Sequence, residues 1–334
     1  MSEGGDKDNG KRQDRLRLVI SSSPHVRKGT SVERIMYAVV LCLIPALAAS
    51  VYCFGYKVLA IVGVSVGAAL LTEFLAKRLR KKPFEMDGSA VITGLILGLM
   101  MPPGLEWGQL WLPAVGAFFA IAIVKEAFGG LGSNIWNPAA GGFLFCLLSW
   151  AAMMGVGWIA DGGIVWEMMR TEATPLVDLE KGEVSMEVVK NLFLGNVNGA
   201  LGETSALALL IGGLALIGLR YIDWRIPLSF IGTVGVLTFA QTGDPILTLA
   251  YLFAGGLFLG AFFMLTDYVT SPLTGWGRVL FGVGAGAVVV VIRLFANPME
   301  GVAYSIIFMN MFTPLIDRYL KTEPFGRIKK EAEG

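Results

Sequence analysis

The chain has 334 residues, of which 54% are hydrophobic and only 16% are charged, and its mean hydropathy is +0.65. Soluble domains have roughly 25% charged residues. This deficit of charge excludes a water-soluble enzyme, a disordered chain and a collagen-like repeat, and it indicates a helical protein with several membrane spans. With a single histidine, His25, and three scattered cysteines, we expect no metal site and no haem held by two histidines of this chain.

The first 33 residues form a polar, basic arm without the early apolar stretch of a cleavable signal peptide. Ten hydrophobic runs of membrane length follow, and they predict ten spans near 36–54, 58–76, 88–103, 109–125, 139–157, 204–219, 226–241, 245–264, 278–294 and 302–317. The remaining residues, 321–334, form a basic tail. We therefore expect one membrane domain, 34–320, between two cytoplasmic ends.

The distribution of lysine and arginine sets the orientation of these spans. If there are ten spans, the basic arm, the basic loop after the second span and the basic tail all fall on one side, which is then the cytoplasm. On the other side, the longest loop, 158–203, contains eight acidic and three basic residues. The termini are thus predicted to be cytoplasmic and Thr204 extracytoplasmic.

A weak internal repeat relates the two parts of the chain. The motif Asn137-Pro138-Ala-Ala-Gly recurs as Asn297-Pro298-Met-Glu-Gly, and the segment 103–108 recurs loosely as 272–277. The first motif stands at the start of two spans and the second at the end of two spans, and the two copies of each fall on opposite faces of the membrane. Two inverted halves, 34–157 and 204–320, would give this pattern. The alternative is chance punctuation of span ends by proline and glycine.

The acidic loop ends in Gly202-Glu203-Thr204-Ser205, immediately before an apolar run. A hydroxyl at that point caps the first turn of a helix by accepting a hydrogen bond from a free backbone N–H. The same geometry also favours an anion, so a hydroxyl here could instead carry or contact a phosphorylated group. The pattern alone leaves both interpretations open.

A glycine-rich segment on the cytoplasmic side begins with Lys125-Glu126 and ends with Asn134-Ile-Trp-Asn137-Pro138. Asn134 and Asn137 share a face if this stretch is helical, and their amides would suit the edge of a flat heterocycle. The alternative is a glycine-rich turn whose asparagines cap their own backbone.

Two acids stand near predicted span ends. Asp267 lies in Thr266-Asp267-Tyr-Val-Thr270, and Asp87 precedes Gly88 and Ser89. Each is either a functional group or an interfacial residue that reaches water. The sequence shows no row of charges near the middle of the spans, which argues against a complete ion pump in this chain alone.

Five motifs in order identify a family resemblance over roughly residues 20–320. They are Ser23-Pro24-His25, Asp87-Gly88-Ser89-Ala90, Lys125-Glu126 with Asn134-Ile-Trp-Asn137-Pro138, Gly202-Glu203-Thr204-Ser205, and Thr266-Asp267 with Thr270-Ser271-Pro272. Together they resemble the NqrB/RnfD family. The length favours its RnfD branch, whose members are membrane subunits of Rnf-type ion-translocating ferredoxin:NAD oxidoreductase complexes.

The resemblance implies ten helices in two inverted repeats and a covalent FMN, attached through its phosphate to Thr204 by a flavin transferase that uses FAD. The neighbours of Thr204 in the motif, Gly202, Glu203 and Ser205, would belong to that site. The segment with Lys125, Asn134 and Asn137 is similar to one that holds a second, non-covalent flavin, riboflavin. Asp267, in a further family motif, is also a candidate for cofactor binding.

The resemblance also implies that the chain is one subunit of a redox-driven ion translocase in a bacterial or archaeal cytoplasmic membrane, inactive without its partner subunits. It would relay single electrons through flavin and have no contact with nucleic acid. Thr204 is an anchor for the cofactor, so no catalytic residue is assigned. The sequence has neither a dinucleotide-binding motif nor cysteine spacing for an iron–sulfur cluster.

Three alternatives make different predictions. An NqrB-like subunit of a sodium-pumping NADH:quinone oxidoreductase would handle quinone, although the short N-terminal arm weighs against it. A secondary transporter or channel with inverted repeats would be colourless and would bind its substrate near the middle of the membrane. A structural scaffold for a redox complex would tolerate Thr204→Ala without loss of electron flow.

Overall fold

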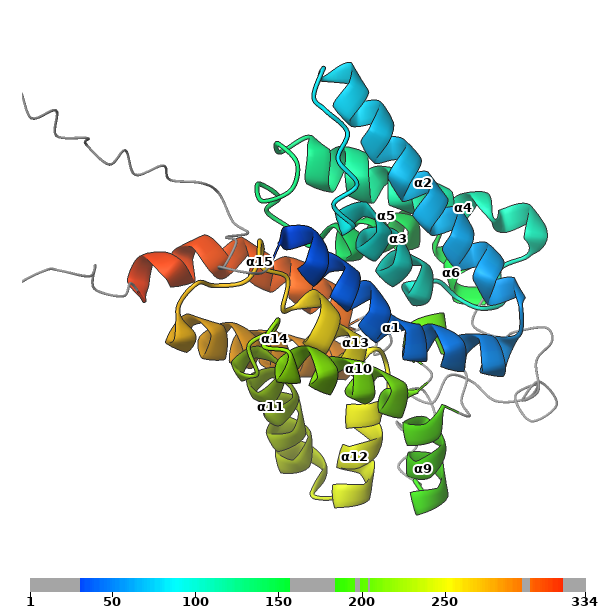
Figure 1. Cartoon of the computed structure of the whole chain (residues 1–334). Helices are drawn as coiled ribbons and strands as arrows, with labels where there is room; N and C mark the ends of the chain where they lie inside the picture. The colour runs from blue at the N-terminus through cyan, green and yellow to red at the C-terminus, as the bar shows by residue number, and fades with distance from the viewer. Residues whose placement is uncertain (1–30, 157–183, 196–198, 204, 296–300, 321–334) are drawn as a thin grey trace, which may run out of the picture.

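The computed structural model describes residues 31–156, 184–195, 199–203, 205–295 and 301–320, and within these ranges every regular element is a helix (Figure 1). Each of the ten predicted runs contains helix. Four helical stretches are long and apolar enough to cross a membrane: α1 (Val32–Phe54), α2 (Lys57–Leu79), the stretch Trp107–Glu126 and α14 (Gly275–Phe295). The predicted all-α class is therefore confirmed.

The other helices are shorter. The stretch Trp107–Glu126 is built from η1 (Trp107–Gln109), α4 (Trp111–Phe118) and η2 (Phe119–Glu126). The rest are α3 (Ser89–Met100), α5 (Pro138–Ser149), α6 (Ala151–Val156), α9 (Met186–Leu194), η3 (Leu201–Glu203), α10 (Ala206–Gly218), α11 (Arg225–Thr242), α12 (Pro245–Phe253), α13 (Leu257–Leu259), η4 (Gly260–Met264) and α15 (Gly301–Tyr319). Both η2 and η4 are π-helices, whereas η1 and η3 are 3₁₀ helices.

The predicted span 245–264 is bent, because the chain turns by 62° between α12 and the segment Leu257–Met264. Gly255 and Gly256 connect the two parts with φ values of 69° and 65°. This left-handed conformation costs glycine little and other residues more, so a glycine pair can end one helix and redirect the next. The bent pair counts as a fifth candidate span when taken as one.

The region 158–203, predicted as a loop, contains a helix within its described part. Helix α9 begins at a serine cap, since Ser185 accepts a hydrogen bond from the backbone of Val188, and it ends at Gly195 with a φ of 111°. Val189 and Leu192 of α9 pack against Ala250 and Ala254, at the end of α12. The apolar face of α9 thus covers the bent span.

Glycines let the long helices approach closely. A methyl group on Gly94 of α3 would lie 2.6 Å from the Cα atom of Val66 on α2, and one on Gly286 of α14 would lie 2.8 Å from the carbonyl oxygen of Phe230 on α11. Both glycines belong to four-residue repeats, with Gly98 and Gly282. Small residues at this spacing allow helix backbones to pack tightly in membranes, where the hydrophobic effect does not drive association.

Two groups of helices result, with one helix pair between them. In Figure 1, α2 to α5 lie together, α11 to α14 form a second group, and α1 runs beside α10 where the groups meet. Helices α5 and α15 also touch across the two groups. The polar side chains described next lie where these groups meet.

Candidate functional site

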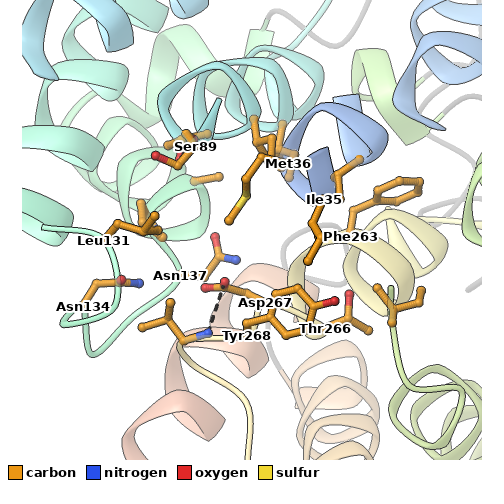
Figure 2. A pocket seen from close by; sticks show the side chains of 18 of the residues that line it. Ile35, Met36, Ser89, Leu131, Asn134, Asn137, Phe263, Thr266, Asp267 and Tyr268 are labelled. Atoms are coloured by element: carbon orange, nitrogen blue, oxygen red, sulfur yellow. Dashed lines mark hydrogen bonds between the residues drawn. The ribbon is translucent and has the colours of Figure 1, made fainter. Parts of the chain in front are cut away.

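A polar cavity lies where helix ends from both groups converge (Figure 2). Its walls come from the starts of α1 and α3, the end of η2, the loop before α5, and the segment after η4. Figure 2 shows Ser89, Asn137 and Asp267 directed into the same space from three different elements. The cavity has a volume of about 90 Å³, room for a few water molecules. A larger ligand would also occupy its open mouth.

Both π-helices lead into this cavity. Helix η2 ends with Lys125 and Glu126, and η4 ends two residues before Thr266. A π-helix widens the helical turn, and such segments occur frequently at functional sites. Here they bring charged and hydroxyl groups to the ends of apolar helices.

Lys125 is the central charged group of the cavity wall. Its side chain is only 2% exposed, and its Nζ lies 2.7 Å from Oε1 of Glu73 on α2 and 2.6 Å from Oγ of Ser89. The Ser89 hydroxyl donates in turn to Oδ1 of Asp87 at 2.5 Å. A buried ion pair needs such additional hydrogen bonds to offset its loss of hydration. The predicted residues Lys125 and Asp87 are thus joined through Ser89.

A second buried acid stands next to Lys125 in the sequence. Oε2 of Glu126 lies 3.0 Å from Nη1 of Arg80, and Arg80 also donates to the backbone carbonyl of Glu126. The other carboxylate oxygen, Oε1, is buried without a hydrogen-bond partner among the described residues. This arrangement ties the end of η2 to the end of α2.

The two asparagines do not share a helical face, because residues 127–136 form turns rather than a helix. Asn137 caps α5: its Oδ1 accepts from the backbone of Ala140, and its Nδ2 donates to the carbonyl of Met264 at 3.2 Å. Asn134 donates to the carbonyl of Trp136. The structure thus shows the alternative interpretation, a glycine-rich turn with asparagines bonded to nearby backbone, and both side chains line the same cavity.

Asp267 faces the cavity just beyond the last turn of η4. Burial raises the pKa of this carboxyl group, while hydrogen bonds from the Val269 backbone and the Thr270 hydroxyl, together with the charge of Lys125, act in the opposite direction. Burial has the larger effect, because removing a carboxylate from water disfavours its charged form. The cavity thus brings together four of the predicted site residues: Lys125, Asn134, Asn137 and Asp267.

The other predicted residues lie elsewhere, at the start of α10, and none of those that the structure describes lines the cavity. Ser205 caps α10 by accepting from the backbone of Ala208 at 3.2 Å, which confirms the capping interpretation for this residue. Gly202 packs on α3, where a methyl group would lie 2.8 Å from Cβ of Leu99. Thr204 lies outside the described residues. We call Gly202, Glu203 and Ser205 the outer segment.

Two buried charged residues escaped the sequence analysis. Glu73 on α2 and Arg293 on α14 are 2% and 7% exposed, and the sequence analysis named neither. Each lies in the last turns of its predicted span, 58–76 or 278–294. A charged residue inside an apolar run indicates a buried partner, and this signal is present in the sequence at both positions.

The architecture is therefore that of an all-helical membrane protein with a charged cavity at its helix ends. The chain also matches the family model described as "NQR2, RnfD, RnfE family" over residues 19–326. Since this match covers most of the chain, the protein belongs to that family.

Curated relatives agree with this assignment. The chain is 44% identical to the D subunit of the Na(+)-translocating ferredoxin:NAD(+) oxidoreductase complex of Acetobacterium woodii, over 95% of this chain and 99% of the relative. It is 43% identical to the proton-translocating counterpart of Clostridium ljungdahlii, over 92% and 96%. It is 36% identical to the D subunit of the ion-translocating oxidoreductase complex of Stutzerimonas stutzeri, over 89% and 93%.

Proposed function

We propose that this chain is the RnfD-type membrane subunit of a complex that couples electron transfer between ferredoxin and NAD to ion translocation. In this role it relays electrons through an FMN joined covalently to Thr204. The names of relatives that match nearly the whole chain support the complex. The observation that carries the flavin site is the outer segment, where a helix starts directly after Thr204.

The residues around Thr204 fit a phosphate-linked group. The Ser205 hydroxyl is already used by the first turn of α10, and Thr204 supplies the second hydroxyl of the motif. A buried arginine, Arg293, lies near the outer segment, and its Nε is buried without a hydrogen-bond partner among the described residues. In the attachment step a flavin transferase moves the FMN phosphoryl group from FAD to the Thr204 hydroxyl, and AMP leaves. The bound FMN supplies one-electron transfer.

The cavity suits a second, non-covalent flavin such as riboflavin. Its polar side holds the amides of Asn134 and Asn137 with the carboxylate of Asp267, and its apolar walls include Met36 and Phe263. A flat heterocycle needs this combination of apolar faces and a polar edge. Lys125 lies in the wall of the cavity with its charge paired to Glu73.

Helix pairing supports the proposal of two inverted five-helix halves. In the first half α2 packs on α4 and α4 on α5; in the second, α11 packs on α14 and α14 on α15. In the predicted order of spans, α2, α4 and α5 are the second, fourth and fifth spans of the first half, and α11, α14 and α15 hold the same places in the second half. The contacts of α1 with α10 and of α5 with α15 then join equivalent helices across the centre, as an inverted repeat requires.

This arrangement sets the location and the partners of the chain. We place it in a bacterial or archaeal cytoplasmic membrane, with both termini in the cytoplasm and Thr204 on the outer side. The cavity then opens toward the cytoplasm, because the starts of α1, α3 and α5 line it. Other members of the complex supply and accept the electrons, and a flavin transferase matures the chain.

The test is a denaturing gel of the chain produced together with an active flavin transferase and viewed under ultraviolet light. We expect fluorescence on the 35.8 kDa band, and a peptide around Thr204 whose mass is increased by FMN minus water. Thr204→Ala should abolish both. The matched control is Ser185→Ala, which removes the equivalent serine cap of α9 and should remain fluorescent.

A dark wild-type band with an unmodified peptide, while the same transferase labels a known flavoprotein substrate, would overturn the covalent flavin. The transporter interpretation would then predict a colourless protein with a ligand bound inside the membrane domain.

A further inference from the structure

A second hollow of the molecule lies where α11 and α14 begin and α15 ends. It is a groove with a volume of about 720 Å³, and it shares no lining residue with the polar cavity. Aromatic rings, one arginine and aliphatic side chains form much of its wall: Trp224, Arg225, Leu228, Trp276, Val279 and Tyr319. The groove is therefore a separate feature with an amphipathic lining.

The aromatic side chains of the groove point away from the core. Trp224, Trp276 and Tyr319 are 54%, 78% and 77% exposed. Helix α14 is long and apolar enough to cross a membrane, and Trp276 is its second residue. Tryptophan and tyrosine are enriched at the membrane–water interface, where their rings lie among the lipid headgroups. The groove thus lies at headgroup depth.

Arg225 is the charged residue in the wall of the groove. Its Nε lies 4.0 Å from Oδ1 of Asp223, whereas Oδ2 of the same carboxylate lies 2.6 Å from Nη1 of Arg278. The carboxylate is therefore bound closely to Arg278. The side chain of Arg225 donates no hydrogen bond within the described part of the chain. Two arginines share one carboxylate, which leaves this group with a net positive charge.

The guanidinium of Arg225 is held between two helices. It lies 6.0 Å from the ring centroid of Trp224, within the range of a cation–π interaction. A methyl group on Gly275 of α14 would collide with it, so the guanidinium packs on the backbone of the glycine. The side chain is still 44% exposed, and its donors can therefore reach a ligand in the groove.

The polarity of the groove changes along the helices. Leu228 follows Arg225 by three residues on α11, and Val279 follows Trp276 by three residues on α14. Each aliphatic side chain is therefore about one helical turn further into the span than its polar or aromatic neighbour. A matching ligand has an anionic end at the membrane surface and an apolar end that points into the membrane.

We propose that this groove binds an anionic phospholipid, whose phosphate pairs with Arg225 and whose acyl chains run past Leu228 and Val279. Arginine forms paired hydrogen bonds with phosphate, and basic pockets between membrane helices bind lipid headgroups. The three aromatic rings would enclose the glycerol region. Only the leaflet rests on the proposed function, because the orientation proposed there places this end of the helices on the cytoplasmic side.

The experiment is native mass spectrometry of the purified full-length chain in an uncharged detergent. The chain is titrated with phosphatidylglycerol or with phosphatidylcholine of the same acyl chains. We expect a several-fold preference for one phosphatidylglycerol. Arg225→Gln should weaken the binding of phosphatidylglycerol by about fivefold, the effect of about 1 kcal/mol per basic residue near an anionic surface. Phosphatidylcholine should be affected less, and Arg225→Lys should retain most of the preference.

Two matched variants control for general effects. Arg318→Gln removes an exposed arginine at the same end of α15 that does not line the groove, and it should leave both affinities unchanged. Trp276→Leu should weaken both lipids, whereas Trp107→Leu, in the matching segment of the repeat, should weaken neither. If Arg225→Gln fails to fold, which its elution volume and melting temperature will show, the comparison of the two tryptophan variants decides.

Three results would overturn the proposal. The first is a wild-type chain without preference for phosphatidylglycerol. The second is an equal loss in Arg225→Gln and Arg318→Gln, or in the two tryptophan variants. The third is competition by glycerol phosphate at the concentration of the lipid, which would indicate a site for a soluble anion. A dimer that Trp276→Leu dissociates would assign the groove to a second copy of the chain. None of these measurements depends on flavin, so they fail or succeed independently of the proposed function.

Discussion

One buried cation lies at the cavity and another, Arg293 of α14, lies at the helix bend, but the two cations have different partners. Lys125 forms an ion pair with Glu73 and a hydrogen bond with Ser89. Arg293 donates to carbonyls at a helix bend, with the charge of Glu203 nearby. The first arrangement pairs its charge with a carboxylate in direct contact, whereas the second holds the cation on backbone carbonyls. The difference teaches that a buried cation can be stabilised in two ways, by an opposite charge on another helix or by the carbonyls of a helix end.

The comparison fits the proposed roles. A non-covalent ligand in the cavity would be held by shape and by neutral polar groups such as the amide of Asn134. An attached phosphodiester needs no binding energy to stay, but its charge must be balanced. The following predictions test this division, from the largest expected effect to the smallest.

Removing the charge of Lys125 should have the largest effect on stability. Lys125→Met leaves the carboxylate of Glu73 buried with only the longer contact to Lys77, at 3.3 Å. Breaking a buried ion pair on one side costs about 3–5 kcal/mol. We expect a loss near the lower end, about 3 kcal/mol, measured as the shift of the unfolding midpoint in a denaturant titration of the detergent-solubilised chain.

The double variant Lys125→Met with Glu73→Gln is the control. It removes both charges, so it should recover a large part of the stability lost in the single variant. Equal losses in the single and double variants would mean that the pair does not hold the fold in the way described.

A glycine at the helix bend, next to Glu203 of the outer segment, gives the next effect. Gly256 and Gly243 both have a φ of 65°, but a methyl group on Gly256 would meet Glu203, whereas one on Gly243 has nothing within 4 Å. Gly243→Ala should cost about 1–2 kcal/mol for the left-handed conformation alone. Gly256→Ala should cost a further 1–3 kcal/mol or so, because it displaces the carboxylate.

Thermal melting of the two glycine variants measures this difference. A flavin readout adds a sharper comparison, because only Gly256→Ala moves Glu203 and should reduce FMN labelling at Thr204. Equal melting temperatures and equal labelling in the two variants would contradict the contact between Gly256 and Glu203.

Two aspartates outside the spans should respond to pH in opposite directions. The pKa of Asp267 is raised by burial, so the folded state holds its proton more tightly than the unfolded state. Stability from this group is greatest at low pH and falls as the pH rises from the unfolded pKa through the raised folded pKa. Asp267→Asn should therefore gain stability relative to the wild type as the pH rises from about 4 to about 7.

Asp223, between α10 and α11, provides the matched opposite. Partial burial acts to raise its pKa, but hydrogen bonds and charge from Arg225 and Arg278 outweigh this and lower it. Its contribution is present above the unfolded pKa and is lost as the pH falls through the folded pKa. Asp223→Asn should thus be less stable than the wild type near neutral pH, and this difference in stability should disappear as the pH falls. Melting curves of both variants and the wild type at about pH 4 and about pH 7 measure whether the two stability differences change in opposite directions.

Sequence reasoning predicted the helices but not their interruptions. An apolar run of membrane length is a strong signal for helix, because an unpaired backbone is costly in lipid. The bend at Gly255 and Gly256 has a weaker signal, since glycines are frequent in membrane helices without breaking them. Helix α9 was missed because its short apolar face is interrupted by charged residues in an acidic region.

The sequence predicted which residues belong to the site but not how these residues are arranged in space. The motifs named Lys125, Asn134, Asn137 and Asp267 separately, and their convergence on one cavity required the fold. Glu73 could not be linked to Lys125 by sequence, because 52 residues separate the two. Arg293 was overlooked because a single charge near the end of an apolar run resembles an interfacial residue.

The sequence by itself thus determined the class of protein, the positions of its helices and the family motifs, since these depend on local hydrophobicity and on the identity of short segments. Only the tertiary structure decided which charges are buried together and which helices bend. A lone buried charge is prohibitively unfavourable in an apolar interior, so its partner must come from another helix. That choice is made by packing between segments distant in the sequence, and no local pattern records it.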